Sequence, residues 1–345
     1  MSDIIPYPVK DTLGRPIRDL RISVTDRCNF RCIYCMPREV FGPGYAFVPR
    51  NELLTLEEIA RIAHVFAMAG MRKVRITGGE PMIRRNLEHL IEMLDAIDGV
   101  EDISMTTNGS MLTLGRAQDL KRMGLKRLTV SLDALDDETF KRINDVDYPV
   151  SRVLDGIENA RAAGFTGIKV NAVVRRGFNE HAVLPLAEHF RGTDCIVRFI
   201  EFMDVGETNG WNMKDVIPAG ELVRQIDAHY ALEPVSPNYR GEVAKRWRYR
   251  DSEGEIGFIT SVTESFCGEC SRARLSAVGK IYTCLFGTEG HDIRELLRAE
   301  ASDAQLLRRL SEIWQPRTDR YSELRSQFLA DSVARPKVEM SHIGG

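Results

Sequence analysis

The sequence lacks several features that would place it in particular classes of protein. No apolar run approaches the roughly 18 residues of a membrane span, and Met1 to Lys10 lacks the apolar core of a signal peptide. The 47 basic and 50 acidic residues leave a formal net charge of −3. A chain without a basic excess has no general field for nucleic acid and no polybasic membrane anchor. We therefore expect a cytoplasmic protein that binds neither nucleic acid nor a membrane.

What the sequence does contain is typical of a globular protein. Of its 345 residues, 43% are hydrophobic and 28% are charged, and no short repeat or low-complexity segment stands out. This length has room for one large domain and an appended one. The seven cysteines are an odd number, and six of them fall into two groups of three. In a chain without a secretion signal, that pattern favours metal binding over disulfides.

The first cysteine group is Cys28, Cys32 and Cys35, spaced C-x3-C-x2-C directly after a strand-like run at 20–25. Three sulfurs at this spacing can converge on one centre from a single compact loop. A [4Fe–4S] cluster takes four thiolates, so three from the protein would leave one iron open for a reactant. A zinc site, a redox pair or buried thiols are the alternatives, although structural zinc usually has four closed ligands.

The second cysteine group is Cys267, Cys270 and Cys284, spaced C-x2-C-x13-C. A second cluster with three thiolates would again leave one iron open, here for a substrate nitrogen or oxygen. A zinc site would need a fourth ligand, for which Cys195 or His291 would have to serve.

Two further motifs are candidates for ligand binding. Arg272 and Arg274 can face one side of an extended segment, and paired arginines suit bidentate recognition of phosphate. Ordinary surface charge is the alternative. In Gly78-Gly79-Glu80-Pro81, two glycines would let the backbone approach a ligand beside a carboxylate. The alternative there is a strand-to-helix turn.

Strand-like and helical patterns alternate over the first two thirds of the chain. The predicted strands are 20–25, 73–77, 102–107, 127–132, 168–174 and 196–203, and the predicted helices are 55–69, 85–97, 115–123, 151–163 and 181–190. This alternation favours parallel βα units. Six such units predict an α/β fold, an incomplete (βα)6 TIM-type barrel. Two more units would be needed for an eight-stranded barrel, and the pattern does not contain them. In such barrels the chemistry lies at the C-terminal ends of the strands.

The ends of the chain have a different character. Residues 1–19 are polar and contain prolines, which predicts an N-terminal arm. Beyond about 210 the βα rhythm stops, 238–257 suggests short strands and loops, and 292–331 is helical in pattern. We expect a partial barrel at 1–220 with the first cluster. A C-terminal α+β region at 221–345, with the second cluster and a Gly-Gly tail, would close its open side.

Taken in order, these motifs resemble one family over nearly the whole chain. They are the first cysteine group with Met-Pro, then Arg-Ile-Thr-Gly-Gly-Glu-Pro, Thr-Thr-Asn-Gly, Ser-Leu-Asp, Lys-Val-Asn, Phe-Ile-Glu-Phe-Met, the second cysteine group and a terminal Gly-Gly. The family is the molybdenum cofactor biosynthesis protein A family, the GTP 3′,8-cyclases of the radical S-adenosylmethionine (SAM) superfamily. Its fold is an incomplete (βα)6 barrel closed by a C-terminal region.

The resemblance implies a lyase that uses SAM and two [4Fe–4S] clusters. The open iron of the first cluster would chelate the methionine part of SAM, whose cleavage gives a 5′-deoxyadenosyl radical. That radical would abstract the hydrogen at C3′ of GTP, and C3′ would attack C8. The product would be (8S)-3′,8-cyclo-7,8-dihydroguanosine 5′-triphosphate, in the first step of molybdenum cofactor (molybdopterin) biosynthesis. The implied partners are an external electron donor, a downstream cyclic pyranopterin monophosphate synthase and a second copy in a homodimer.

The resemblance also implies roles for individual residues. The first cluster would be held by Cys28, Cys32 and Cys35, and the second by Cys267, Cys270 and Cys284. SAM would contact Tyr34, Gly79, Ser131 and Met203. GTP would contact Arg21, Arg75, Thr106, Lys169, Arg272, Ala273 and Arg274. The catalytic group would comprise Arg272, Arg274, Gly344 and Gly345, the two glycines threading into the active site. Ser271 stands where the family pattern has asparagine.

Two other functions compete with this hypothesis. One is a radical SAM enzyme with an auxiliary cluster that acts on a peptide or another small molecule. The other is a zinc- or iron–sulfur-bearing module that binds or carries electrons without catalysis. The chemistry of the metal would separate the last from the others.

Overall fold

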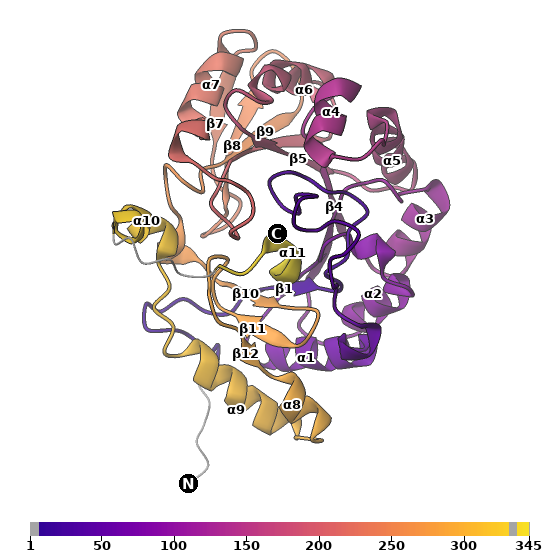
Figure 1. The fold of residues 1–345 in the computed structure, drawn as a ribbon, viewed down its shortest axis with the longest axis vertical. Coiled ribbons are helices and arrows are strands. Elements are labelled where there is room, and N and C mark those ends of the chain that lie inside the picture. Colours follow the sequence, from indigo (N-terminus) through magenta and orange to yellow (C-terminus); the bar gives the residue numbers. More distant parts are fainter. Residues whose placement is uncertain (1–6, 331–336, 345) are drawn as a thin grey trace.

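The computed structural model describes residues 7–330 and 337–344. Figure 1 shows one curved sheet with helices around its outside and the C-terminal end of the chain near the centre. The first six strands are β1 (Asp19–Ser23), β2 (Lys73–Thr77), β3 (Asp102–Thr107), β4 (Arg127–Ser131), β5 (Lys169–Val174) and β6 (Ile196–Glu201). They pair in parallel and in order, as the alternating pattern predicts.

Helices cover the outer face of these strands. They are α1 (Leu56–Met68), α2 (Leu87–Asp95), α3 (Leu114–Arg122), α4 (Asp137–Asn144), α5 (Val150–Ala162) and α6 (Val183–Phe190). Helix α1 begins at a capping box in which Thr55 and Glu58 bond each other's backbone, and its apolar face includes Ile59, Ile62 and Phe66. All the predicted helices in this part are present, which confirms the partial-barrel fold.

Helix α4 is absent from the prediction. Asp136 caps its first turn by accepting from the Thr139 amide, and Asp145 ends it in a left-handed conformation. Only a narrow face, including Phe140 and Ile143, is buried. A short helix that is mostly polar has too little apolar periodicity to stand out from a loop.

The C-terminal part adds strands to both edges of the same sheet. These are β7 (Leu232–Val235), β8 (Ala244–Tyr249), β9 (Glu255–Ile259), β10 (Arg272–Leu275), β11 (Lys280–Tyr282) and β12 (His291–Asp292). The sheet order is β12-β11-β10-β1-β2-β3-β4-β5-β6-β9-β8-β7. Strand β10 is parallel to β1 and β9 is parallel to β6, whereas the outer strands are antiparallel.

Strands β9 and β10 therefore extend the parallel part of the sheet, although neither belongs to a βα unit. Neither β9 nor β10 is followed by a helix that returns to a neighbouring parallel strand, so the periodicity could not reveal them. One continuous sheet contains strands from both sides of residue 220. The division into 1–220 and 221–345 stays a prediction.

The remaining helices complete the C-terminal part. They are α7 (Ala219–Asp227), α8 (Arg294–Arg298), α9 (Asp303–Trp314), α10 (Tyr321–Ala330) and α11 (Met340–Ile343). Short 3-10 helices occur at Arg50–Glu52, Pro81–Ile83, Glu180–Ala182, Met213–Asp215 and Cys267–Glu269. Helix α9 packs against α1, and α11 packs against β1 inside the ring (Figure 1).

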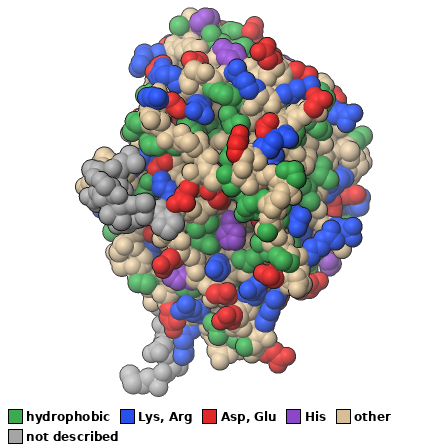
Figure 2. Space-filling view, viewed as in Figure 1, with side chains coloured by type: hydrophobic (Ala, Val, Ile, Leu, Met, Phe, Trp, Pro, Cys, Tyr) green, Lys and Arg blue, Asp and Glu red, His purple; other side chains and the backbone are tan. Residues whose placement is uncertain are grey.

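The surface carries charges of both signs. On the face seen in Figure 2, lysine and arginine side chains are interspersed with aspartate and glutamate. Among residues 7–330 and 337–344, no helix is both long and apolar enough to cross a membrane.

Candidate active site

The barrel encloses a cavity of about 330 Å³, a size within the range of small-molecule sites (roughly 300–1,000 Å³). Both cysteine groups line it, although they are far apart in the sequence. So do the other predicted site residues Tyr34, Gly79, Ser131, Met203, Arg21, Arg75, Thr106, Lys169, Arg272 and Arg274. The tertiary structure thus brings the two predicted metal sites into one chamber.

The first cysteine group lies in a loop that leaves the C-terminal end of β1. The loop turns back on itself because the Cys35 and Met36 amides both donate to the Cys32 carbonyl, at 2.9 and 2.8 Å. The end of helix α4 supports it, since the Arg31 amide donates to the Asn144 carbonyl at 2.9 Å. The helix missing from the prediction therefore positions the cysteine loop.

Burial controls the chemistry of these thiols. It raises the pKa of Cys28 and of Cys35 to about 12 and that of Cys32 well above its usual range. All three are free and partly exposed to the cavity. Such thiols become thiolates only when a bound cation compensates their charge.

The two glycines after β2 allow a close packing of backbone on backbone. The Gly79 amide donates to the Thr25 carbonyl at 2.8 Å, and the Glu80 amide donates to the Arg27 carbonyl at 2.8 Å. A Cβ atom at Gly79 would overlap the Arg27 carbonyl, and one at Gly78, whose φ is +153°, would overlap the Thr25 carbonyl. The glycine pair thus holds the turn against the loop that carries Cys28.

Glu80 itself joins neighbouring strand ends. Its buried carboxylate accepts hydrogen bonds from the Met82 amide (3.0 Å), the Thr107 hydroxyl (2.7 Å) and the Asn108 amide (2.7 Å). A carboxylate with these bonds acts as a bridge between the ends of β2 and β3.

Asp133 organises the wall beside Tyr34, a role that the Ser-Leu-Asp motif alone did not reveal. Its carboxylate accepts from the Tyr34 hydroxyl at 2.7 Å and from the Val173 amide at 2.7 Å. Burial raises the pKa of Asp133 to about 6 against the effect of these bonds. The Tyr34 ring is thereby held at the cavity wall beside the first cysteine group.

The second cysteine group lies at the opposite edge of the same chamber. Cys267 begins the 3-10 helix before β10, Cys270 directly follows that helix, and Cys284 follows β11. Burial raises the pKa of Cys284 to about 12. Burial also acts to raise the pKa of Cys270, but the Arg272 and Arg317 charges, together with hydrogen bonds from Arg272, outweigh it and lower the pKa to about 6. The Arg272 guanidinium donates to the Cys270 sulfur at 3.3 Å.

Neither candidate for a fourth zinc ligand joins this group. Cys195 is buried in the hydrophobic core, and His291 is exposed on β12. Among the described residues that line the cavity there is no histidine. The zinc alternative therefore gains no closed set of four ligands.

Ser271 has a defined place in this loop. Its hydroxyl donates to the Asp19 carboxylate at 2.9 Å, and its carbonyl accepts from the Arg18 and Asp19 amides at 3.0 and 3.2 Å. Serine thus ties the second cysteine loop to the beginning of β1.

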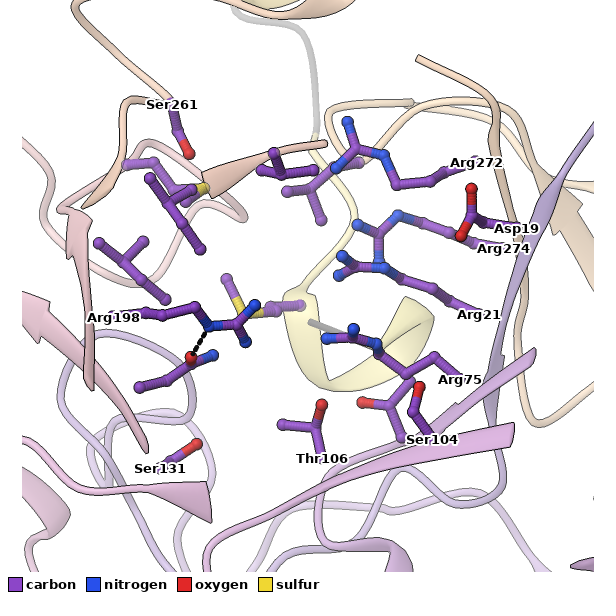
Figure 3. A pocket seen from close by; sticks show the side chains of 18 of the residues that line it. Asp19, Arg21, Arg75, Ser104, Thr106, Ser131, Arg198, Ser261, Arg272 and Arg274 are labelled. Carbon is purple, nitrogen blue, oxygen red and sulfur yellow. Dashed lines mark hydrogen bonds between the residues drawn. The ribbon is translucent and has the colours of Figure 1, made fainter. Parts of the chain in front are cut away.

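A row of arginines spans three adjacent strands. Arg21 of β1 is in register with Arg75 of β2 on one side and with Arg274 of β10 on the other. Figure 3 shows one wall that presents Arg272, Arg274, Arg21 and Arg75, with Arg198 reaching toward them from the opposite wall. Ala273 lies between two of these arginines but is buried in the hydrophobic core, on the other face of β10.

The cations lower one another's pKa values. Burial and the Arg272 charge lower the pKa of Arg274 to about 9, and burial and the Arg75 charge do the same for Arg198. Burial, with Arg198, Arg127 and Arg75, lowers the pKa of Lys169 to about 7. Buried cations that repel one another favour a multiply charged anion between them.

Three cations that line the cavity are not among the predicted site residues: Lys73, Arg127 and Arg198. Lys73 and Arg127 are the first residues of their strands, and Arg198 donates to the Asn171 side chain at 2.8 Å. The sequence signal that could have identified them is their position in a strand, because every second side chain of a strand points to the same face of the sheet. The sequence pattern alone does not show which of the two faces points into the barrel.

The C-terminal tail enters the same chamber. Met340 lines the cavity, Ser341 and Ile343 are buried, and the Gly344 carbonyl accepts a hydrogen bond from the Arg274 guanidinium. A Cβ atom at Gly344, whose φ is +74°, would overlap the Thr77 methyl group. The other predicted tail residue, Gly345, lies outside the described residues.

Comparisons with known proteins give a consistent result. A model of the radical SAM superfamily matches residues 22–190, and a model described as Molybdenum Cofactor Synthesis C matches residues 195–323. A protein named GTP 3′,8-cyclase from Acidothermus cellulolyticus is 51% identical over 360 residues, covering 98% of this chain and 99% of its own. A protein of the same name from Staphylococcus epidermidis is 49% identical over 338 residues, with the same coverage of 98% and 99%.

Solved structures agree with the fold. Streptococcus suis SuiB aligns with a TM-score of 0.60 at 14% identity, over 91% of this chain and 69% of that one. SuiB bound to SAM aligns with a TM-score of 0.59 at 14% identity, over 84% of this chain and 66% of that one. At this identity the likeness concerns the fold alone.

Proposed function

Because this chain belongs to the family of the GTP 3′,8-cyclases, within the radical SAM superfamily, we propose that it converts GTP to (8S)-3′,8-cyclo-7,8-dihydroguanosine 5′-triphosphate in molybdenum cofactor biosynthesis. One observation carries the proposal. Two groups of three free cysteines line a single cavity, and a row of arginines on β1, β2 and β10 lines the same cavity. A substrate that combines a triphosphate with a base suits a chamber built in this way.

The cysteine groups suit iron–sulfur clusters. Each offers three free thiols at the cavity wall, a donor set that leaves one iron of a [4Fe–4S] cluster without a protein ligand. Cys28, Cys32 and Cys35 would hold the first cluster, and Cys267, Cys270 and Cys284 a second. When bound, the first cluster and SAM supply the 5′-deoxyadenosyl radical.

The chain's own residues would orient SAM at the first group. Tyr34, held by Asp133, offers an aromatic face for the adenine. The Gly79 backbone, together with Ser131 and Met203, completes that end of the cavity. The close packing of Gly79 on the cysteine loop couples the SAM site to the cluster site.

The arginine row would hold the triphosphate. Arg21, Arg75, Arg272 and Arg274 are crowded cations, and a phosphate chain relieves their mutual repulsion through charge-assisted hydrogen bonds. The Thr106 hydroxyl is buried without a partner in the cavity wall, and a ligand oxygen would satisfy it. Lys169 adds a cation whose charge depends on the anion beside it. With the guanine at the second cysteine group, these contacts would hold GTP at both ends and keep its ribose between them.

The remaining assignments complete the proposal. Ala273 would contact GTP through its backbone, and Gly344 and Gly345 would close the active site beside Arg274. An external electron donor, a downstream cyclic pyranopterin monophosphate synthase, a homodimeric state and a cytoplasmic location are part of the same proposal.

Anaerobic turnover tests it. Reconstituted protein would be incubated with SAM, dithionite and GTP, and the nucleotide products identified by mass and nuclear magnetic resonance spectroscopy. We expect 5′-deoxyadenosine and the cyclised nucleotide to form in step. Arg272→Ala and Arg274→Ala should each weaken GTP binding at least tenfold, because each removes a charge-assisted contact of about 1.5–3 kcal/mol. Deoxyadenosine without a cyclised nucleotide would refute the proposed substrate.

A further inference from the structure

A buried ionic network lies behind the second cysteine group. It consists of Asp11 and Arg15 from the N-terminal arm and Arg317 and Asp319 from the segment between α9 and α10. The Asp11 carboxylate accepts from the Arg15 guanidinium at 2.6 Å and pairs with Arg317 at 3.3 Å. The side chains of Asp11, Arg15 and Arg317 are 0%, 3% and 1% exposed. Arg317 also pairs with Asp319 at 3.1 Å, whose side chain is 32% exposed.

The arginines of the network donate hydrogen bonds to the backbone carbonyls of both cysteines of the C-x2-C motif. Arg15 donates to the Cys267 carbonyl at 2.7 Å and to the Asp319 carbonyl at 2.8 Å. Arg317 donates to the Cys270 carbonyl at 2.7 Å. Arg15 bonds Asp11 through Nε and the cysteine loop through Nη1, whereas Arg317 bonds both Asp11 and the cysteine loop through Nη1.

The surroundings keep both guanidinium groups in place. The Arg15 carbonyl accepts from the Trp314 indole at 3.0 Å, and the Arg317 guanidinium stacks over the Trp314 ring at 4.5 Å. The Arg317 carbonyl accepts from the Thr12 hydroxyl at 2.7 Å. Through these contacts the N-terminal arm packs against helix α9 and the segment after it, next to the cysteine loop that both contact.

The charge of this network is not balanced by buried carboxylates. Two buried guanidinium groups face one buried carboxylate, and Asp319 is partly in water. In addition, the Nη2 atom of Arg15 is buried without a hydrogen-bond partner. Two buried cations with one buried carboxylate are costly for a merely structural bridge, since a hydrophobic replacement of an ion pair is often as stable. Two buried guanidinium groups, compensated by one buried and one partly exposed carboxylate, are favourable beside a group that is itself negative.

Three thiolates around an iron–sulfur core make such a negative group. The potential of a cluster depends on net charge, on hydrogen bonds and on solvent exposure around it. We propose that Arg15 and Arg317 are positioning residues of the second cluster site, which fix the Cys267 and Cys270 carbonyls and raise the reduction potential of the cluster there. The inference rests on the proposed function, because it requires that the second cysteine group holds a cluster.

The test isolates the second site. In a parent protein in which Cys28, Cys32 and Cys35 are replaced by serine, the second cluster would be titrated anaerobically with electron paramagnetic resonance detection. Arg317→Met removes the charge, its two ion pairs and the bond to the Cys270 carbonyl. It should lower the ratio of reduced to oxidised cluster about tenfold at a fixed potential (59 mV for one electron). Arg317→Lys keeps the charge, so its potential should stay near that of the parent while iron is lost faster to a chelator.

A matched control separates these effects from stability. Arg61 pairs with Asp303 at 2.9 Å and donates to the Ala301 carbonyl, so Arg61→Met also removes an arginine that joins the barrel to the C-terminal helices. It should leave the potential and the iron release rate unchanged. The same measurements on Arg15→Lys give a second, milder disturbance of the network.

The outcomes are distinguishable. If Arg317→Met and Arg15→Lys keep the parent's potential and iron release rate, while their thermal stability falls as in Arg61→Met, the network is structural and the inference is overturned. If Arg317→Met does not fold, an unchanged iron release rate in both lysine variants overturns it equally. If the parent itself takes up no iron, the second cluster of the proposed function is refuted and the inference falls with it.

Discussion

Lys169 lines the cavity and has a pKa close to neutral pH, so its charge is sensitive to a bound anion. Burial, with Arg198, Arg127 and Arg75, holds its pKa at about 7, and Glu242 acts in the opposite direction. A bound triphosphate would favour the ammonium form and raise that pKa. At pH below about 7 the group is protonated with or without GTP. Between the free and the bound pKa, binding takes up a proton, so affinity falls as pH rises.

We therefore expect GTP affinity to fall by up to about tenfold per pH unit above pH 7. Titration calorimetry in two buffers of different ionisation enthalpy would measure both the affinity and the proton uptake. GTP has its own phosphate proton, so Lys169→Met is the necessary control. That variant should bind more weakly and take up fewer protons. Equal proton uptake in both proteins would show that Lys169 does not titrate on binding.

Gly79 allows a prediction about side-chain volume. Gly79→Ala places a methyl group against the Arg27 carbonyl, so the turn and the loop that carries Cys28 must separate. Forced overpacking of this kind costs about 1–3 kcal/mol. If that cost falls on the bound state, SAM binding to the reconstituted protein should weaken by roughly fivefold to a hundredfold, measured by equilibrium dialysis under anaerobic conditions.

Gly115 provides the matched control. It lies in helix α3, and no atom lies within 4 Å of an added Cβ. Gly115→Ala should therefore leave SAM binding unchanged and raise stability by up to about 1 kcal/mol. Normal SAM binding by Gly79→Ala would show that the turn can relax without disturbing the site.

At the level of elements, the C-terminal tail is held by more than its helix α11. The Lys337 ammonium pairs with the Asp204 carboxylate at 2.8 Å, just after β6. The Glu339 carboxylate accepts from the Glu207 amide at 3.0 Å and from the Thr208 hydroxyl at 3.1 Å. These bonds hold the segment that leads to Met340, which lines the cavity, and to Gly344, whose carbonyl accepts from Arg274.

This arrangement predicts a selective defect when the tail is shortened. Removal of Gly344 and Gly345 should abolish cyclisation of GTP, because the carbonyl that meets Arg274 is lost. Both clusters and the cleavage of SAM should survive, because the cysteine groups lie on other segments. Iron content, deoxyadenosine and cyclised nucleotide would be measured on the same samples.

Gly344→Ala is a smaller change at the same place. Its methyl group would overlap Thr77, and its backbone would have to hold a left-handed φ that alanine disfavours. It should impair cyclisation in the same selective way. Full activity of the truncated protein would contradict the role proposed for the tail.

At the scale of the whole molecule, strand pairing decides the function. The two cysteine groups come from opposite ends of the chain, and β10 brings them together by pairing with β1. The same pairing completes the arginine row, since Arg274 stands beside Arg21. The chamber therefore exists only when both parts of the chain share one sheet.

Replacement of one cysteine group should nevertheless remove only the cluster that this group holds. The wild-type protein should hold about eight irons per chain, and replacement of either group by serine should leave about four. Without the first group, SAM should not be cleaved. Without the second, SAM should be cleaved but GTP should not be cyclised. Loss of all iron from either variant would show that the sites are not separate.

Much of the fold could be predicted because its signals are local. The βα alternation predicted β1 to β6 and their main helices, since each element carries its own periodicity and caps. The parallel additions β9 and β10 could not be predicted, because their partners β6 and β1 are distant in the sequence and pairing leaves no local signature. Helix α4 was missed because its buried face is too small.

The site divides in the same way. The cysteine spacings and the glycine pair point to a metal and a ligand wherever the chain folds. By contrast, Arg198, Arg15 and Arg317 look like ordinary surface charges until burial and partners are known. A lone charged residue carries no sign of which side of a strand or loop it will occupy.

The sequence by itself determined the class of chemistry, because ligand spacing and backbone freedom are properties of short segments. It determined the partial barrel for the same reason. Only the tertiary structure decided that both cysteine groups face one chamber, that the arginines stand in a row, and that the N-terminal arm reaches the second group. Those facts depend on hydrogen bonds between distant strands and on the burial of particular charges, which arise only when the whole chain is folded.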